Sequence, residues 1–191
     1  MGTSVGIYVF PDVEELDFVG PWEVLRCWEH AWAGDGTEVF LFADEEGVVQ
    51  CAKGLRVLPD HRTAELPRLD VLVYPGGPGT RGQLGDPARR AWLRAMAETG
   101  TLMTSVCTGA LVLADAGLLD GLGATTHWAA LDRLAELGHD VSVRTGARFV
   151  DAGPVVTAAG VTAGIDMALH LVSRLHSPER ASEVARYIEH S

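Results

Sequence analysis

The 191-residue sequence has little positive charge, since 15 Lys and Arg face 26 Asp and Glu and leave a net charge of −11. No segment gathers Lys and Arg into a cluster, whereas proteins that bind a phosphate backbone carry basic stripes. No apolar run approaches the ~20 residues that a membrane-spanning helix needs. We therefore expect neither nucleic acid nor a membrane as partner. A small neutral molecule or a second copy of the chain fits this composition better.

Cysteine is also scarce. The three cysteines, Cys27, Cys51 and Cys107, stand at wide spacings that fit neither a disulfide framework nor a zinc site. The first six residues lack the basic segment of a secretion signal, and Gly6 departs from the myristoylation pattern. We expect a cytoplasmic protein with reduced thiols.

Short apolar runs alternate with helix-forming segments along the chain. Strands are predicted over residues 5–10, 39–43, 70–74 and 101–106, and helices over residues 18–31, 87–99, 108–116, 128–137, 162–175 and 178–189. Two short runs around residues 52–54 predict a hairpin at an edge of the sheet. The alternation predicts an α/β fold in one domain (residues 1–191), with a mostly parallel sheet covered by helices on both faces.

Cys107 lies where a predicted strand meets a predicted helix. The residues Ser105-Val106-Cys107-Thr108-Gly109 have the form of a nucleophile elbow, in which a sharp turn presents the nucleophile at the carboxyl edge of the sheet. The N–H groups of the following helix and its dipole favour a thiolate, so we expect a lowered thiol pKa. The alternative is a small apolar cysteine packed beneath a helix.

A carboxylate is expected beside this thiol. Asp17 follows the first predicted strand and so reaches the same sheet edge as Cys107, where it could shuttle a proton. Two acidic groups this close would share a proton rather than ionise independently. The alternative for Asp17 is the N-cap of the helix expected from Phe18.

Further candidates follow other strands. Backbone N–H groups of Gly76 and Gly77, with that of Thr108, could hold developing negative charge, although most Gly-Pro segments are ordinary turns. His127 could orient water or substrate, but such a histidine is more often a packed, hydrogen-bonded residue. Trp22 and Trp128 could line an apolar pocket or belong to the core. Asp166 is interpreted as a carboxylate in the first turn of a helix.

Taken together, these motifs resemble the ThiJ/PfpI superfamily, and within it the isonitrile hydratases. The segments that carry the resemblance are Phe10-Pro11-Asp12-Val13, Leu16 to Pro21, Tyr74-Pro75-Gly76-Gly77, Thr104 to Gly109, Ala124 to Trp128 and Thr162 to Asp166. They run in order over nearly the whole chain, from about residue 6 to residue 175.

The resemblance implies a flavodoxin-like three-layer sandwich, a homodimer and a cysteine nucleophile at Cys107. It implies Asp17 as the acid partner and Thr108 as a site residue, with neither a metal nor an organic cofactor. Peptidase and deglycase branches differ at the positions of Thr108 and Asp17. Gly20 and Val161 are further pocket candidates.

The activity implied is hydration of an isonitrile to an N-substituted formamide through a thioimidate on Cys107. Two features depart from the hydratases: residues 158–160 are less glycine-rich, and the chain ends soon after its last predicted helix.

Sensor domains of certain AraC-type regulators share almost the same motifs. No helix-turn-helix region follows Ser191, so we expect not a complete regulator but at most a relative of such a sensor, acting as a redox, electrophile or ligand-binding domain. Glyoxalase-like hydration of 2-oxoaldehydes is a third possibility.

Overall fold

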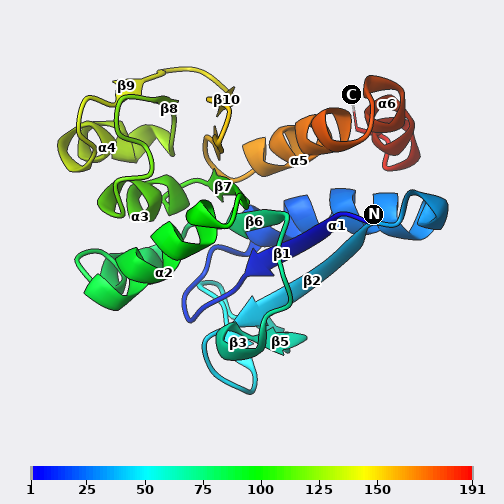
Figure 1. Cartoon of the computed structure of the whole chain (residues 1–191), viewed down its shortest axis with the longest axis horizontal. Coiled ribbons are helices and arrows are strands. Elements are labelled where there is room, and N and C mark those ends of the chain that lie inside the picture. Colours follow the sequence, from blue (N-terminus) through cyan, green and yellow to red (C-terminus); the bar gives the residue numbers. More distant parts are fainter. Residues whose placement is uncertain (1, 191) are drawn as a thin grey trace.

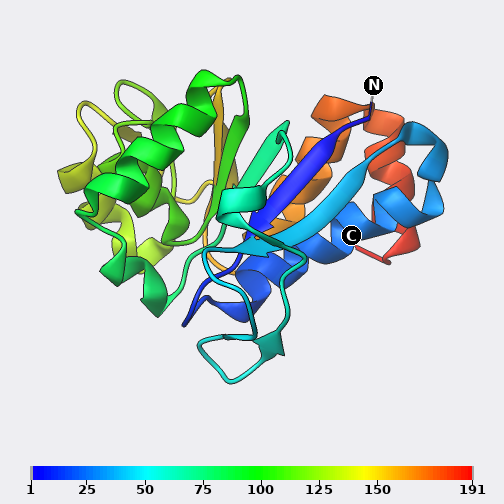
Figure 2. The ribbon, with the colours of Figure 1, turned by 60° about the horizontal axis from the view of Figure 1, so that its bottom comes forward.

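The computed structural model describes residues 2–190, which form a seven-stranded sheet with helices on both faces (Figures 1 and 2). The strand order is β10-β11-β7-β6-β1-β2-β5, and only the β10–β11 pair is antiparallel. The strands are β1 (Ser4–Tyr8), β2 (Glu38–Ala43), β5 (His61–Arg62), β6 (Val71–Tyr74), β7 (Leu102–Val106), β10 (Phe149–Asp151) and β11 (Val155–Ala158). The predicted α/β sandwich with a mostly parallel sheet is confirmed.

The helices divide between the two faces of the sheet. Figure 2 shows α1, α5 and α6 on one face and α2, α3 and α4 on the other. Their bounds are α1 (Glu15–Ala31), α2 (Pro87–Glu98), α3 (Gly109–Asp115), α4 (Leu131–Leu137), α5 (Ala163–Leu175) and α6 (Pro178–Tyr187). Four short 3-10 helices join them: η1 (Ala33–Asp35), η2 (Thr63–Glu65), η3 (Pro78–Gly82) and η4 (Trp128–Ala130).

The central strands are almost continuously apolar because helices cover both of their faces. All residues of β6 and β7 are buried, and β1 is buried from Val5 onward. These three strands end at the same edge of the sheet, because they are parallel neighbours. The segments that follow them therefore meet there, and this edge holds the candidate site.

Some boundaries differ from prediction. Helix α1 begins at Glu15 rather than near Phe18, and it accommodates Pro21 in its second turn. The predicted hairpin forms as β3 (Val49–Gln50) with β4 (Arg56–Val57), a separate two-stranded sheet rather than an edge of the main one. A second small sheet pairs β8 (Gly123–Ala124) with β9 (Ser142–Val143). Among the described residues, no helix is both long enough and apolar enough to span a membrane.

Candidate active site

Cys107 occupies a sharp turn between β7 and α3. Its φ of 56° lies in the left-handed region, which costs a residue with a Cβ roughly 1–3 kcal/mol. The surrounding backbone holds this conformation: the Cys107 N–H donates to the carbonyl of Ala159 at 2.9 Å, and the Thr126 hydroxyl donates to the Cys107 carbonyl at 2.6 Å. The residue is only 7% exposed, and it lines a pocket. The predicted strand–turn–helix placement of the thiol is thus present.

Asp17 lies directly beside the thiol. It is fully buried in the first turn of α1, and the Cys107 side chain is within hydrogen-bonding reach of its carboxyl group. The Gly76 N–H donates to Asp17 Oδ2 at 3.0 Å, whereas Oδ1 has no hydrogen-bond partner among the described residues. The N-cap interpretation of Asp17 is wrong, because α1 begins two residues before it and Glu14 occupies the cap position.

The pKa values of both groups are raised. Burial, which the Gly76 hydrogen bond only partly offsets, raises the pKa of Asp17 to about 7. Burial and the nearby charge of Asp17 raise the pKa of Cys107 to about 12, against the opposing effect of the Thr108 N–H. The expectation of a lowered thiol pKa is therefore wrong, because desolvation outweighs the helix terminus. The pair retains at least one proton at neutral pH, as expected for two adjacent acids.

Thr108 connects the thiol to the glycine loop after β6. Its N–H and hydroxyl both lie near enough to the Cys107 side chain to lower the pKa of the thiol. Its Oγ1 accepts from the Gly77 N–H at 3.0 Å and from the Thr80 hydroxyl at 3.1 Å. A Cβ on Gly76 would lie 2.5 Å from the Thr108 nitrogen, so the loop can approach this closely only with glycine there.

The two glycine amides do not form a free oxyanion hole. The Gly76 N–H is engaged by Asp17 and the Gly77 N–H by Thr108. Their expected role is therefore corrected: they hold the acid and the threonine in place. The Thr108 N–H is the predicted amide that does point at the sulfur.

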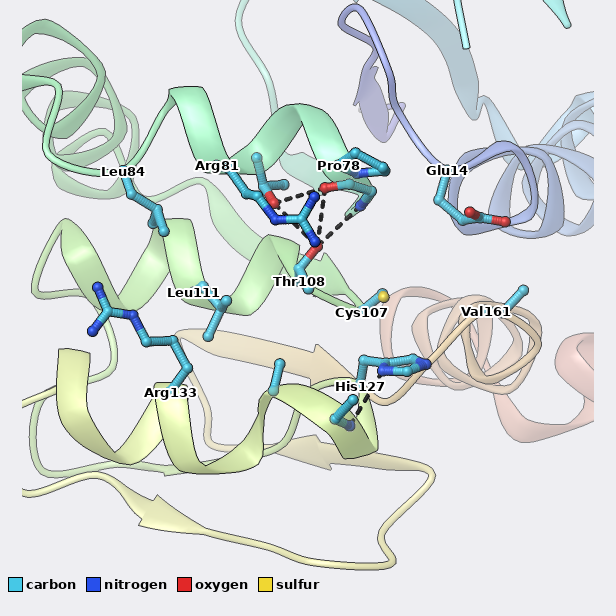
Figure 3. Close-up of a pocket in the computed structure, with 14 residues that line it drawn as sticks. Glu14, Pro78, Arg81, Leu84, Cys107, Thr108, Leu111, His127, Arg133 and Val161 are labelled. Carbon is cyan, nitrogen blue, oxygen red and sulfur yellow. Dashed lines mark hydrogen bonds between the residues drawn. The ribbon is translucent and has the colours of Figure 1, made fainter. Parts of the chain in front are cut away.

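A pocket of about 410 Å³ opens in front of Cys107 (Figure 3). Of the other predicted residues, Gly77, Thr108, His127 and Val161 line it. The His127 Nδ1 accepts the Ala129 N–H at 3.3 Å, so a neutral His127 carries its proton on Nε2. Val161 has a φ of 51°, a second left-handed residue with a Cβ at the pocket wall.

Three predicted pocket residues lie elsewhere. Trp128 is 79% exposed and borders a neighbouring hollow, because the start of η4 turns it toward solvent. The Arg26 guanidinium lies over the ring of Trp22, 5.1 Å from the centroid of that ring. Trp22 is not part of the Cys107 pocket. Gly20 packs α1 against α5, where its Cβ position is 3.1 Å from Ile165 Cγ1. Asp166, in the first turn of α5, pairs with Arg148.

Sequence reasoning missed several residues that line the pocket. They are Glu14, Pro78, Thr80, Arg81, Leu84, Leu111, Ala129, Ala130 and Arg133. Following η3 beyond the glycine loop would have indicated Thr80 and Arg81, since both follow a strand that ends at this edge. No local signal marks Arg133. Within residues 2–190, no group of three or more His, Cys, Asp or Glu side chains is arranged to hold a metal ion.

Known proteins share both the sequence and the fold of this chain. The DJ-1/PfpI family profile matches residues 3–174, and the chain belongs to that family. It is 36% identical to isonitrile hydratase from Pseudomonas putida over 191 residues, which are all of this chain and 80% of the relative. It is 34% identical over 186 residues to the transcriptional regulator CdhR from Pseudomonas aeruginosa, covering 97% of this chain but 54% of the regulator.

Solved structures agree with the family assignment. A ThiJ/PfpI family protein from Pseudomonas syringae superposes with a TM-score of 0.88 at 32% identity, over 99% of this chain and 75% of that one. Drosophila melanogaster DJ-1beta gives a TM-score of 0.88 at 25% identity, over the full length of both chains. Family members thus include enzymes and regulators, and the chemistry of this chain must be argued from its own site.

Proposed function

We propose that this protein hydrates isonitriles to N-substituted formamides, with Cys107 as nucleophile. The observation that carries the proposal is a buried thiol in contact with a buried carboxyl group, in front of a pocket large enough for a small molecule. The full-length similarity to an isonitrile hydratase supports this substrate class.

The first step joins the thiol to the terminal isonitrile carbon. The raised pKa of Cys107 keeps its proton on sulfur at rest, so Asp17 accepts that proton as the C–S bond forms. The same proton then passes to the isonitrile carbon, and the product is the thioimidate R–N=CH–S–Cys107. A carboxyl pKa of about 7 suits a group that takes up and returns a proton near neutral pH.

Water completes the reaction. It adds to the thioimidate carbon, with one proton going to nitrogen, and gives R–NH–CH(OH)–S–Cys107. The C–S bond then breaks as the hydroxyl proton is lost, releasing R–NH–CHO, and the sulfur recovers its proton through Asp17. The Thr108 N–H and hydroxyl stabilise negative charge on the departing sulfur. The Nε2–H of His127 is a donor in the pocket that could hold the incoming water.

Cys107→Ala should lower isonitrile turnover by at least about 1000-fold, because no other group can form the thioimidate. Formation of the formamide is followed by NMR with cyclohexyl isonitrile. Cys27→Ala and Cys51→Ala are matched controls, since both thiols are buried outside the pocket. Comparable turnover by the Cys107 variant and the wild type would eliminate the mechanism.

A second candidate is a sensor or ligand-binding domain, favoured by the similarity to CdhR over nearly this whole chain. In its redox form, peroxide would convert the Cys107 thiolate to a sulfenic acid and release hydroxide. The raised thiol pKa argues against rapid oxidation, because the thiolate is the reactive species. Intact-mass analysis after peroxide titration, beside assays with isonitrile and methylglyoxal, separates the candidates. Stoichiometric oxidation of Cys107 without turnover of either compound would favour the sensor.

A further inference from the structure

We propose that the preferred substrate is an isonitrile whose R group ends in a carboxylate, which the guanidinium groups on the wall of the Cys107 pocket, those of Arg81 and Arg133, bind. This inference deepens the proposed hydratase activity and rests on it. It also departs from the neutral ligand that the net charge of the chain suggests.

Charge is divided along the pocket. The acidic groups gather at the thiol, where Asp17 is in contact with Cys107 and Glu14 lines the wall. The Glu14 carboxylate is already paired with the Lys53 ammonium. In Figure 3, Glu14 lies on one side of Cys107, while Arg81 and Arg133 lie on the other. An elongated substrate with one anionic end therefore has a single favourable orientation.

The two arginines differ in how they are engaged. Among residues 2–190, no carboxylate pairs with Arg81, which η3 presents to the pocket immediately after the glycine loop. Arg133 contacts Glu136 at 2.9 Å in an exposed pair one turn along α4, and such pairs contribute little free energy. A guanidinium donates two parallel hydrogen bonds to a carboxylate, so both side chains can take a ligand of this kind.

Apolar side chains lie between the Cys107 thiol and Arg133. Leu84 and Leu111 line this part of the pocket with Ala129 and Ala130. Figure 3 shows Leu111 between Cys107 and Arg133. A short methylene chain fits such a wall, and it would place an isocyano carbon at the sulfur and a carboxylate within reach of a guanidinium group on the pocket wall.

Arg81 and Arg133 bring positive charge to the pocket, although the chain as a whole is negatively charged. A net charge of −11 repels an anion at long range, but charges separated by more than about 8 Å are largely screened at physiological salt. The guanidinium groups of Arg81 and Arg133 line the pocket itself and so lie closer to a bound ligand than most of that negative charge. Local recognition of a carboxylate is therefore compatible with an acidic protein.

The test compares γ-isocyanobutyrate with its methyl ester, which has the same isocyano group without the negative charge. We expect wild type to show a higher kcat/KM for the acid. Arg81→Gln should lower the acid-to-ester ratio by about fivefold to tenfold, because it removes one charge-assisted pair in a partly exposed pocket. Arg133→Gln should lower it less, since Glu136 already engages that guanidinium. Arg68→Gln is the charge-matched control, because Arg68 is exposed outside the pocket, and its ratio should equal that of wild type.

Equal kcat/KM values for acid and ester in wild type, or an acid-to-ester ratio in Arg81→Gln that equals that of wild type, would overturn the inference. Failure of the proposed function has a different signature, namely no turnover of acid, ester or cyclohexyl isonitrile. Calorimetric binding of γ-formamidobutyrate and its methyl ester then decides the inference independently of turnover. Tighter binding of the acid that depends on Arg81 supports it, and any other ranking contradicts it.

Discussion

At the scale of single residues, Asp17 links stability to activity. Its buried carboxyl group has a pKa of about 7 in the folded chain, against 3.8 as the ordinary value. The unfolded chain therefore binds fewer protons than the folded chain between these two pH values, and stability falls as pH rises from about 4 to about 7. Above pH 7 the folded protein carries the full cost of a buried negative charge.

Asp17→Asn should therefore stabilise the protein at pH 8 by on the order of 1–3 kcal/mol while abolishing turnover. The Asn side-chain oxygen can still accept the Gly76 N–H, but it cannot take the thiol proton. Urea unfolding at pH 8 and at pH 4 measures the effect, which should disappear at the lower pH. Asp132→Asn, at an exposed site outside the pocket, is the control. An equal loss of stability at both pH values would contradict this account.

The same titration should appear in the kinetics. In wild type, kcat/KM should fall as pH drops through about 7, because protonated Asp17 cannot accept the thiol proton. A rate that stays constant from pH 5 to pH 8 would remove Asp17 from the role of base.

At the scale of elements, the site depends on how closely α3 approaches the end of β6. Gly109 is the first residue of α3, and a Cβ there would lie 2.2 Å from the Tyr74 carbonyl oxygen and 2.8 Å from that of Pro75. Both neighbours are backbone atoms, so relieving the clash requires α3 to move away from β6. Such a movement would also displace Thr108 and Cys107.

Gly109→Ala should lower the free energy of unfolding by about 2–3 kcal/mol, as overpacking against a rigid backbone does. Gly34→Ala is the matched control, because nothing lies within 4 Å of a Cβ built there. It should change stability by less than about 1 kcal/mol. Urea midpoints of the two variants provide the comparison, and equal midpoints would show that the β6–α3 contact is not tight.

At the scale of the whole molecule, an ion-pair network joins segments far apart in the sequence. The Arg180 side chain on α6 donates to both Asp35 carboxylate oxygens, at 2.7 and 3.1 Å, across 145 residues of sequence. Trp28 Nε1–H on α1 donates to the same carboxylate at 2.8 Å. Burial opposes ionisation of Asp35, but these partners outweigh it and lower its pKa.

Arg180→Ala should lower the urea midpoint, because it leaves the Asp35 carboxylate with fewer donors in a largely enclosed position. Arg186→Ala is the control: it removes the same charge from the same helix, and among the described residues Arg186 itself forms no ion pair. The difference in urea midpoint between the two variants should shrink as pH falls through the lowered pKa of Asp35, since the neutral carboxyl group no longer attracts Arg180.

The expected homodimer and the expected cytoplasmic location remain predictions. Sedimentation velocity tests the homodimer.

Local patterns in the sequence determined the α/β class, the turn at Cys107 and the pairing of that thiol with Asp17. Strand and helix periodicity is local, and parallel strands bring their carboxyl ends to one edge, so these features followed without coordinates. The start of helix α1 was predicted near Phe18 instead of Glu15, because no side chain caps the first turn of the helix.

Only the tertiary structure decided what surrounds the thiol. The direction of its pKa depends on burial by several elements at once, and the use of the Gly76 and Gly77 amides depends on partners from α1 and the β7–α3 turn. The same holds for Arg81 and Arg133, which come from η3 and α4 and line the same pocket. These properties arise from packing between segments distant in sequence, and periodicity carries no information about such contacts.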